Sequence, residues 1–188
     1  MPRPSVAGER REQIIEATFR TIAEHGISGT TLDRIANAAG MSRGHVRHFA
    51  GNREAILVDA ARAFYARGDD VAILPPSITT LDAALDFLFG PDFVASTAEN
   101  AVILGFVELS RTVPEIATVL TDAYLGVERR LGELIASARP AAPVEKRSDA
   151  AVSVLTAALG TVFIEEFSHD PHRAVRARRA AEALLATL

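Results

Sequence analysis

The segment 32–51, LDRIANAAGMSRGHVRHFAG, constrains the fold of this chain more than any other stretch of its sequence. Its pattern predicts two short helices, 31–38 and 43–50, joined by a turn that contains Gly40. Glycine adopts a positive φ without steric cost, and we expect Gly40 to do so in this turn. A short helix, a glycine-bearing turn and a second helix form a helix-turn-helix, whose second helix enters the major groove of DNA.

Small and apolar residues stand at the offsets that packing between these two helices requires. They are Leu32, Ile35, Ala36, Ala39, Met41, Val46 and Phe49. An ordinary corner between two helices uses the same glycine and the same apolar spacing, so packing alone does not identify a DNA-binding element. The polar residues of the second helix are therefore needed to distinguish a DNA-binding helix-turn-helix from an ordinary corner between two helices.

The polar face of the second helix is basic. Arg43 and Arg47 are four residues apart and therefore share one face, and residues 42–53 contain no acid. Arginine pairs bidentately with guanine O6 and N7, and helix N-termini hold phosphates. Gly44 would let the backbone approach DNA closely. The candidate DNA-binding residues are Thr31, Ser42, Arg43, Gly44, His45, Arg47, His48 and Arg53.

The charge distribution favours the same interpretation. The chain has a net charge of −4, yet residues 1–53 carry eight basic and five acidic groups, a net +3, and three of the five histidines. Residues 54–188 carry 12 basic and 19 acidic groups, a net −7. Such asymmetry is typical of a nucleic-acid-binding module on an acidic body, although two ordinary solvated surfaces would also produce it.

The rest of the chain is also helical in pattern, because no run of β-branched and aromatic residues alternates at period two. Glycines and prolines divide the sequence into helices, which predicts an all-α fold of about nine helices. The expected ranges are 8–25, 31–38, 43–50, 53–68, 79–89, 95–112, 114–138, 145–168 and 171–187. Residues 1–7 are expected to form a loose arm.

The stretch TTLDRIANAAGMSRGHVRHFAGNREAIL resembles the DNA-binding signature of the TetR (tetracycline repressor) family. The resemblance covers about residues 10–60, and the helix number and chain length agree with it. Arg47 and Ala50 depart from a tyrosine and a phenylalanine common in the family, so an operator sequence does not carry over. The matching positions are Thr30-Thr31, Ile35-Ala36, Ala39-Gly40-Met41-Ser42, Gly44 and Arg53-Glu54.

The resemblance implies a helix-turn-helix DNA-binding domain at 8–53 and a helical ligand-binding and dimerisation domain at 54–188. It implies a ligand-responsive repressor that binds a palindromic double-stranded DNA operator as a homodimer and responds to an unidentified small-molecule effector. The last two predicted helices would form a four-helix bundle with a second copy, with Ala181, Leu184, Leu185 and Leu188 at the interface.

The resemblance also implies an effector pocket among the helices within 79–138. Binding pockets are apolar with a few placed polar groups, which guides the choice of candidate residues. The candidate pocket residues are Phe87, Asn100, Phe106, Glu108 and Tyr124. For any single aromatic residue among them, a place in the hydrophobic core is the stronger interpretation.

Other functional classes have little support in the sequence. The chain has no cysteine, so it has neither disulfides nor a thiol nucleophile. The longest uncharged stretch, 150–164, has 15 residues, short of the ~20 that a membrane span needs. We therefore expect a soluble, cytoplasmic protein with no membrane segment.

Two short motifs could indicate an enzyme or a metal site. A single E-x-x-H spacing, Glu166 to His169, lacks the second copy that di-iron bundles use. The sequence His169-Asp170-Pro171-His172 is more typical of a turn before a helix than of a metal site. We expect no enzymatic activity, cofactor or metal. The alternative that stays open is an all-helical ligand-binding or enzymatic protein with an incidental corner of this kind.

Overall fold

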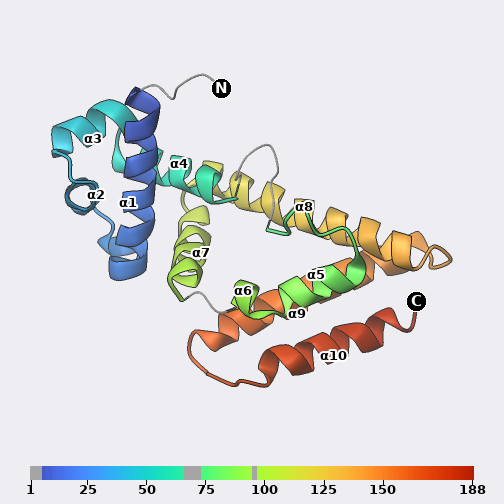
Figure 1. The fold of residues 1–188 in the computed structure, drawn as a ribbon. Coiled ribbons are helices and arrows are strands. Elements are labelled where there is room, and N and C mark those ends of the chain that lie inside the picture. The colour runs from blue at the N-terminus through green and yellow to red at the C-terminus, as the bar shows by residue number, and fades with distance from the viewer. Residues whose placement is uncertain (1–5, 66–72, 95–96) are drawn as a thin grey trace. The chain divides into compact units, whose positions relative to one another are not determined.

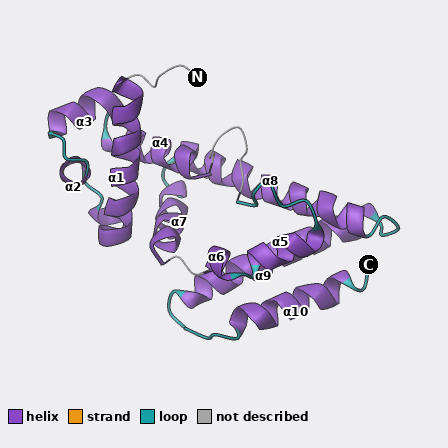
Figure 2. Cartoon of the chain, viewed as in Figure 1, coloured by secondary structure: helices purple, strands orange, loops and turns teal. Residues whose placement is uncertain are grey.

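The computed structural model describes residues 6–65, 73–94 and 97–188, and within these ranges every regular element is a helix (Figures 1 and 2). This confirms the all-α fold. The helices are α1 (Val6–Gly29), α2 (Leu32–Ala38), α3 (Arg43–Ala50), α4 (Arg53–Tyr65), α5 (Leu81–Leu88), α6 (Pro91–Val94), α7 (Thr97–Ser110), α8 (Pro114–Ala138), α9 (Val144–Glu165) and α10 (Arg173–Leu185).

Every predicted helix has a counterpart, and the four-residue α6 is an addition that the sequence pattern did not indicate. The predicted end of the fourth helix, the first two residues of the helix expected at 95–112 and most of the expected N-terminal arm lie outside the described residues. The predicted end of the first helix at Gly26 is confirmed. There the backbone leaves helical geometry, with φ +66° and ψ 173°, before one more turn to Gly29.

The described chain folds as two compact units. The first contains the described residues of Met1–Arg67 and Ala101–Leu120, and the second those of Gly68–Asn100 and Thr121–Leu188. This division differs from the expected boundary after residue 53, because α4 and residues 101–110 of α7 belong with the helix-turn-helix.

A cluster of aromatic rings explains why residues 101–110 of α7 belong to the first unit. Phe106 is 0 % exposed, and its ring lies edge-on to Phe64 of α4 with 6.0 Å between centroids. Phe64 in turn meets Phe19 of α1 edge-on at 5.7 Å. Gly105 lets α7 approach α1, since a Cβ there would lie 3.3 Å from the side chain of Ile22. Edge-to-face ring pairs of this kind stabilise a packed core beyond the area they bury.

The core of the second unit is built from α5, residues 121–138 of α8, α9 and α10. In Figure 1, α9 and α10 run side by side in opposite directions. Each helix contributes buried aliphatic side chains, among them Leu85, Leu131, Val154 and Leu185. By length and composition α9 alone among the described helices is long and apolar enough to cross a membrane, and its residues Ala150, Val154 and Ala158 pack into this core.

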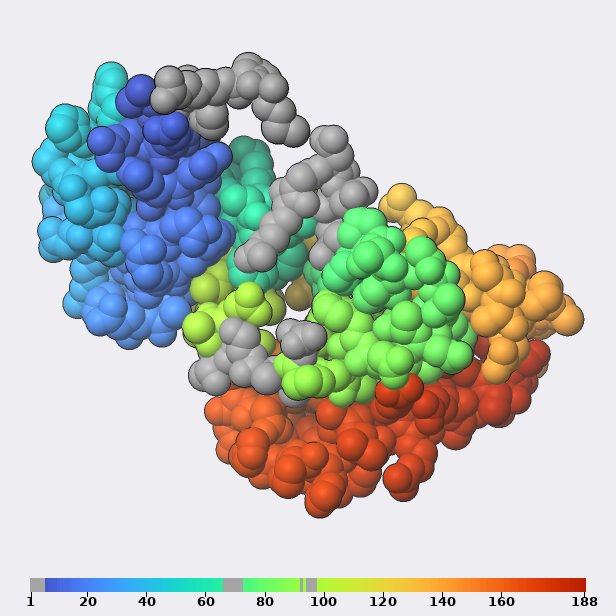
Figure 3. Space-filling model, in the orientation of Figure 1, coloured from blue at the N-terminus to red at the C-terminus, as the bar shows by residue number. Residues whose placement is uncertain are grey.

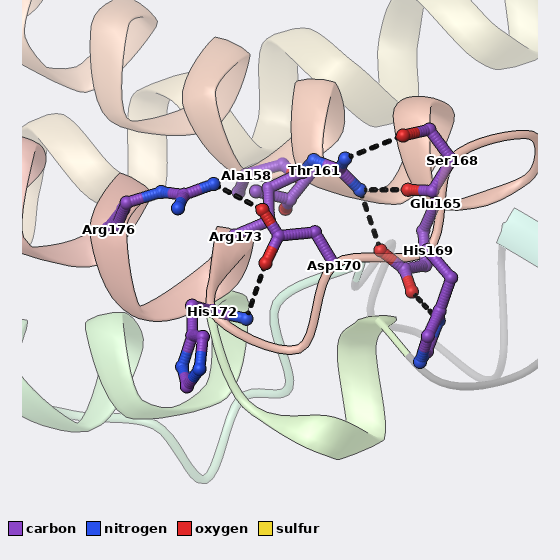
Figure 4. Close-up of polar contacts among 9 residues, drawn as sticks. All are labelled: Ala158, Thr161, Glu165, Ser168, His169, Asp170, His172, Arg173 and Arg176. Atoms are coloured by element: carbon purple, nitrogen blue, oxygen red, sulfur yellow. Dashed lines mark hydrogen bonds and ion pairs between the residues drawn. The ribbon is translucent and has the colours of Figure 1, made fainter.

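The connection between α9 and α10 is fixed by polar contacts (Figure 4). The Arg173 guanidinium donates to Glu165 at 2.8 Å and to the Ser168 hydroxyl at 3.1 Å. The Asp170 carboxylate accepts the backbone N–H of His172 at 2.9 Å and pairs with Arg176. The His172 N–H, and then Arg176, lower the pKa of Asp170 below its ordinary value. The turn interpretation of residues 169–172 is thereby confirmed.

Candidate nucleic-acid interface

Side-chain caps and one glycine set the helix-turn-helix in the first unit. Thr31 caps α2 by accepting the Arg34 N–H at 3.3 Å, and Ser42 caps α3 by accepting the His45 N–H at 3.2 Å. Such caps satisfy amides that have no partner inside the helix. Gly40, between the helices, has φ +66°, which confirms the positive φ predicted for it.

The two helices share a small hydrophobic core with α1 and α4. Ile35 of α2 and Val46 of α3 are fully buried, together with Ile14 of α1 and Ile56 of α4. Ala36 is buried in the same cluster, Leu32, Met41 and Phe49 are partly buried against it, and Ala39 is half-buried at the end of α2. The packing interpretation is therefore confirmed, and the orientation of α3 is fixed by its inner face.

The outer face of α3 is exposed. In Figure 3, α1 to α3, blue to cyan, form one continuous surface. A Cβ on Gly44 would meet only the Ser42 hydroxyl at 3.9 Å, so packing within the protein does not require a glycine there. Six of the predicted DNA-binding residues lie at this exposed end and outer face, namely Ser42, Arg43, Gly44, His45, Arg47 and His48, and Thr31 is exposed at the start of α2.

The two histidines of this face lie beside the same aromatic ring, that of Phe49. His48 meets Phe49 edge-on with 5.0 Å between ring centroids, and His45 lies tilted to the same ring at 6.5 Å. Phe49 is itself partly buried against the core of the helix-turn-helix, so both imidazoles lie beside a ring that the fold positions. Their N–H groups remain available to a ligand on the outer face.

The two arginines of the face differ in their surroundings. Arg43 Nη1 lies 3.3 Å and 3.4 Å from the two carboxylate oxygens of Asp33 on α2. The guanidinium of Arg47 has no hydrogen bond or ion pair to another residue in the described ranges. The basic face thus offers one arginine held by a carboxylate and one that is unrestrained.

Two hollows adjoin this face. One of about 350 Å³ is lined by Asp33, Arg43, Arg47 and neighbouring residues of α2 and the α3–α4 turn. The other, of about 320 Å³, is lined by Ser42, His45 and Phe49 and also by Arg10 of α1. Sequence reasoning missed Arg10, because no spacing relation connects it to a helix that begins 33 residues later.

Arg53, which the sequence places among the DNA-binding residues, has backbone partners that the sequence did not indicate. Its guanidinium is half-buried and donates from Nε to the carbonyl of Thr30 at 2.5 Å and from Nη2 to that of Ile27 at 2.7 Å. It therefore ties the start of α4 to the end of α1, where helix carbonyls lack partners. Arg20 and Arg34 hold the carbonyls of Ala38 and Gly29 in the same way. Part of the basic charge of this region is thus structural.

Replacing Arg53 with methionine should test this assignment. The methionine keeps most of the side-chain volume but leaves two carbonyls without their charged donor, and hydrogen bonds to charged groups contribute about 1.5–3 kcal/mol each. We expect a loss of roughly 2–4 kcal/mol in the free energy of unfolding. This is less than the summed contributions of the two hydrogen bonds, because water reaches the half-buried carbonyls when the guanidinium is removed. Urea denaturation followed by circular dichroism measures it. Unchanged stability with weaker, less salt-dependent DNA binding would instead restore the phosphate-contact assignment.

The structure does not bring the five candidate pocket residues together in one unit. Phe106 is a fully buried core residue of the first unit, and Glu108 is exposed on its surface. Phe87 and Tyr124 are half-buried against the core of the second unit, which also contains the buried amide of Asn100. Glu108 therefore does not supply a polar group to an apolar pocket.

The predicted interface residues of α10 divide between core and surface. Ala181 and Leu185 are 4 % and 3 % exposed and pack inside the protomer, where Leu188 also contacts the core. Among the four, Leu184 is the exposed one. Sequence reasoning missed the exposed apolar side chains nearby, which are Val152, Phe163, Ile164, Phe167 and Val175. The sequence predicted that these two helices pack against a second copy, but it did not indicate which apolar side chains of α9 and of the α9–α10 connection are exposed.

Comparison with known proteins identifies the N-terminal helices. Residues 14–60 match the model of a family described as "Bacterial regulatory proteins, tetR family". Over 62 residues the chain is 45 % identical to the HTH-type transcriptional regulator BetI of Stenotrophomonas maltophilia, and over 73 residues 38 % identical to BetI 1 of Chromohalobacter salexigens. These matches cover 33 % and 38 % of this chain, and it spans about a third of those relatives' length, 32 % and 36 %.

Solved structures extend the likeness of fold to the whole chain. A TetR-family regulator from Cytophaga hutchinsonii matches with a TM-score of 0.79 at 18 % identity, over 100 % of this chain and 98 % of that one. A TetR transcription regulator from Haloarcula marismortui matches with a TM-score of 0.73 at 18 % identity, over 96 % and 98 %. These comparisons show that residues 14–60, which contain the capped helix-turn-helix, match the TetR family of bacterial regulatory proteins, and that the chain as a whole has the fold of solved TetR-family regulators.

Proposed function

We propose that the protein is a cytoplasmic transcriptional regulator that binds double-stranded DNA, with α3 in the major groove. The observation that carries this proposal is the outer face of α3: it is exposed, contains no acid and is held in place by a buried inner face. An α-helix fits the major groove, and the N-terminal residues of a recognition helix contact base edges. Arg43 stands at that end of α3, and Arg47 lies one turn further along.

The other exposed residues suit the sugar-phosphate backbone. Thr31 and Ser42 present hydroxyls at the starts of α2 and α3, where free amides also favour phosphate. His45 and His48 can donate to either bases or phosphates, and Gly44 lets the DNA come close to the helix. Phosphate contacts fix the position of a protein on the duplex, and base contacts give sequence preference.

The proposal includes a homodimer on a palindromic operator. A two-fold dimer places two recognition helices in major grooves on one side of the duplex, about one or more helical turns apart. The exposed apolar side chains of α9, α10 and the connection between them support such an interface, because exposed apolar side chains that gather in one region mark interaction sites, and Phe163 and Phe167 contact each other. Two helices from each copy would form a four-helix bundle.

The proposal also includes repression that a small-molecule effector relieves. In the second unit, Phe87, Asn100 and Tyr124 remain candidates for contact with the effector, with the buried Asn100 amide as the polar group. An effector that binds better to a conformation with low DNA affinity would shift the population away from the DNA-bound form.

Selection of duplexes from a random-sequence library by the purified protein tests the proposed function. We expect salt-sensitive, sequence-preferring binding to a duplex with two inverted half-sites. Arg43→Ala should cost about 1–3 kcal/mol on the selected duplex and relax the preference at one base pair. Fluorescence anisotropy on single-base-pair variants of that duplex measures both effects.

Arg62→Ala is the matched control for this measurement. Arg62 is an exposed arginine of α4 paired with Asp59 at 3.9 Å, so its removal changes the net charge equally without touching α3. A wild-type protein that binds every duplex alike, or none, would contradict the proposed function and favour the ligand-binding or enzymatic alternative. Equal weakening on all duplexes by Arg43→Ala would make Arg43 a phosphate contact.

A further inference from the structure

The one carboxylate among the residues lining the hollow beside α3 belongs to Asp33, and it faces Arg43. An acid at a DNA-facing surface repels phosphates and therefore lowers affinity for all sequences. The pair is also a weak source of folding stability, since the two side chains are 62 % and 63 % exposed and exposed ion pairs contribute little. As an acid in the first turn of α2, Asp33 interacts favourably with the helix dipole, but that interaction does not require the carboxylate to face Arg43.

The geometry of the pair leaves most of the guanidinium available. Both carboxylate oxygens of Asp33 are contacted by the single nitrogen Nη1, at 3.3 Å and 3.4 Å. A guanidinium has five N–H groups, so the donors on Nε and Nη2 remain free to bind DNA. The contact with Asp33 favours orientations of the guanidinium near α2 and leaves free the donors that a bidentate contact with guanine O6 and N7 can use.

The placement of the two residues in the fold favours a role in base recognition. Asp33 lies in the first turn of α2 and Arg43 is the first residue of α3, so the pair connects the two helices of the helix-turn-helix. Both helix starts are capped, by Thr31 and Ser42, which restricts the backbone at each end of the contact. Arg47 has no such carboxylate partner in the described ranges and is free to follow a phosphate.

We propose that Asp33 is a specificity-determining residue that positions the Arg43 guanidinium for a guanine and offsets its non-specific attraction to phosphate. It acts through Arg43 while that arginine contacts the base. The inference rests on the proposed DNA-binding function. The two arginines of α3 then have different roles: Arg43 contacts a base and gives sequence preference, and Arg47 contacts a phosphate and contributes affinity for any sequence.

Asp33→Asn tests the proposal on duplexes recovered by selection with the wild-type protein and on a random-sequence duplex. We expect tighter binding to the random duplex, with a salt dependence steeper by about one phosphate contact. We also expect the preference for the guanine read by Arg43 to fall by roughly three- to tenfold, part of what a bidentate contact contributes. Base preferences at the other base pairs of the selected duplex should stay the same.

Three further variants separate geometry from charge. Asp33→Glu keeps the charge but moves the carboxylate, so it should leave binding to the random duplex unchanged and still lower the guanine preference. In the Arg43→Ala protein, the additional Asp33→Asn substitution should not lower the guanine preference further, because the guanidinium that Asp33 positions is absent. Glu24→Gln removes an exposed carboxylate of α1 (74 % exposed) and should leave the preference intact.

The outcomes distinguish the two proposals. If the wild-type protein shows no sequence preference, the proposed function fails and the role of Asp33 fails with it. If the wild-type protein discriminates but Asp33→Asn tightens binding to every duplex equally, Asp33 acts only by repulsion and the positioning role alone is overturned. Additive effects of Asp33→Asn and Arg43→Ala on the guanine preference would overturn it as well.

Discussion

Replacing Phe167 with aspartate is expected to turn the proposed dimer into a monomer. Phe167 is 70 % exposed just beyond the end of α9, and its ring meets Phe163, 55 % exposed, edge-on at 5.6 Å. Burial of a phenylalanine contributes about 1.5–3 kcal/mol, and a two-fold interface counts it twice. The aspartate also introduces a charge without a partner, whose burial is unfavourable.

The expected cost is therefore at least roughly 3–6 kcal/mol, which corresponds to about a 10²- to 10⁴-fold weaker dimer. Sedimentation equilibrium over a range of concentrations measures the change. Affinity for the selected duplex should fall in parallel, because a monomer places only one recognition helix on the DNA.

Leu125→Asp is the matched control for this variant. Leu125 of α8 is also exposed, at 51 %, and lies in the same unit, but outside the apolar side chains around α9 and α10. It should leave the dimer intact. If Phe167→Asp sediments as the wild-type protein does, the dimer interface is not formed by these residues.

Phe106→Ala is expected to destabilise the protein strongly. The side chain is 0 % exposed, and its ring packs edge-on against Phe64 and at 6.3 Å from Tyr65. Truncation of a buried phenylalanine leaves a cavity and costs about 3–5 kcal/mol. For a chain of this size that corresponds to a fall in Tm of roughly 6–20 °C. Thermal denaturation followed by circular dichroism measures the change.

The same variant separates two roles for Phe106. A ring that lined an open effector pocket would already be partly hydrated, and its truncation would cost less than about 1.5 kcal/mol. A small loss of stability would therefore contradict the assignment of Phe106 to the core. Phe106→Leu, which fills most of the volume, should recover most of the stability and serves as the control.

The helix-turn-helix could be predicted because its determinants are local. Gly40 takes the positive φ that only a residue without a side chain adopts easily, and Thr31 and Ser42 cap helices that begin at the next residue. The apolar positions repeat within one or two turns, so their spacing alone indicates which face of each helix is buried. Interactions over a few residues leave their pattern in the sequence.

The roles of individual side chains depend on partners distant in the chain. Arg53 binds carbonyls 23 and 26 residues before it, and nothing in its own neighbourhood distinguishes it from a phosphate-binding arginine. Arg10 adjoins α3 only because α1 packs on it. Residues 101–110 join the first unit because Gly105 allows close approach to α1.

By itself, the sequence determined the all-α fold, the helix-turn-helix and the basic outer face of α3. Only the tertiary structure decided which arginines are structural, that Asp33 holds Arg43, and that Ala181 and Leu185 are buried in the protomer while Phe167 is exposed. The physical reason is that backbone geometry and capping act between near neighbours. The partner of a long side chain, and the exposure of an apolar one, depend on how whole helices pack.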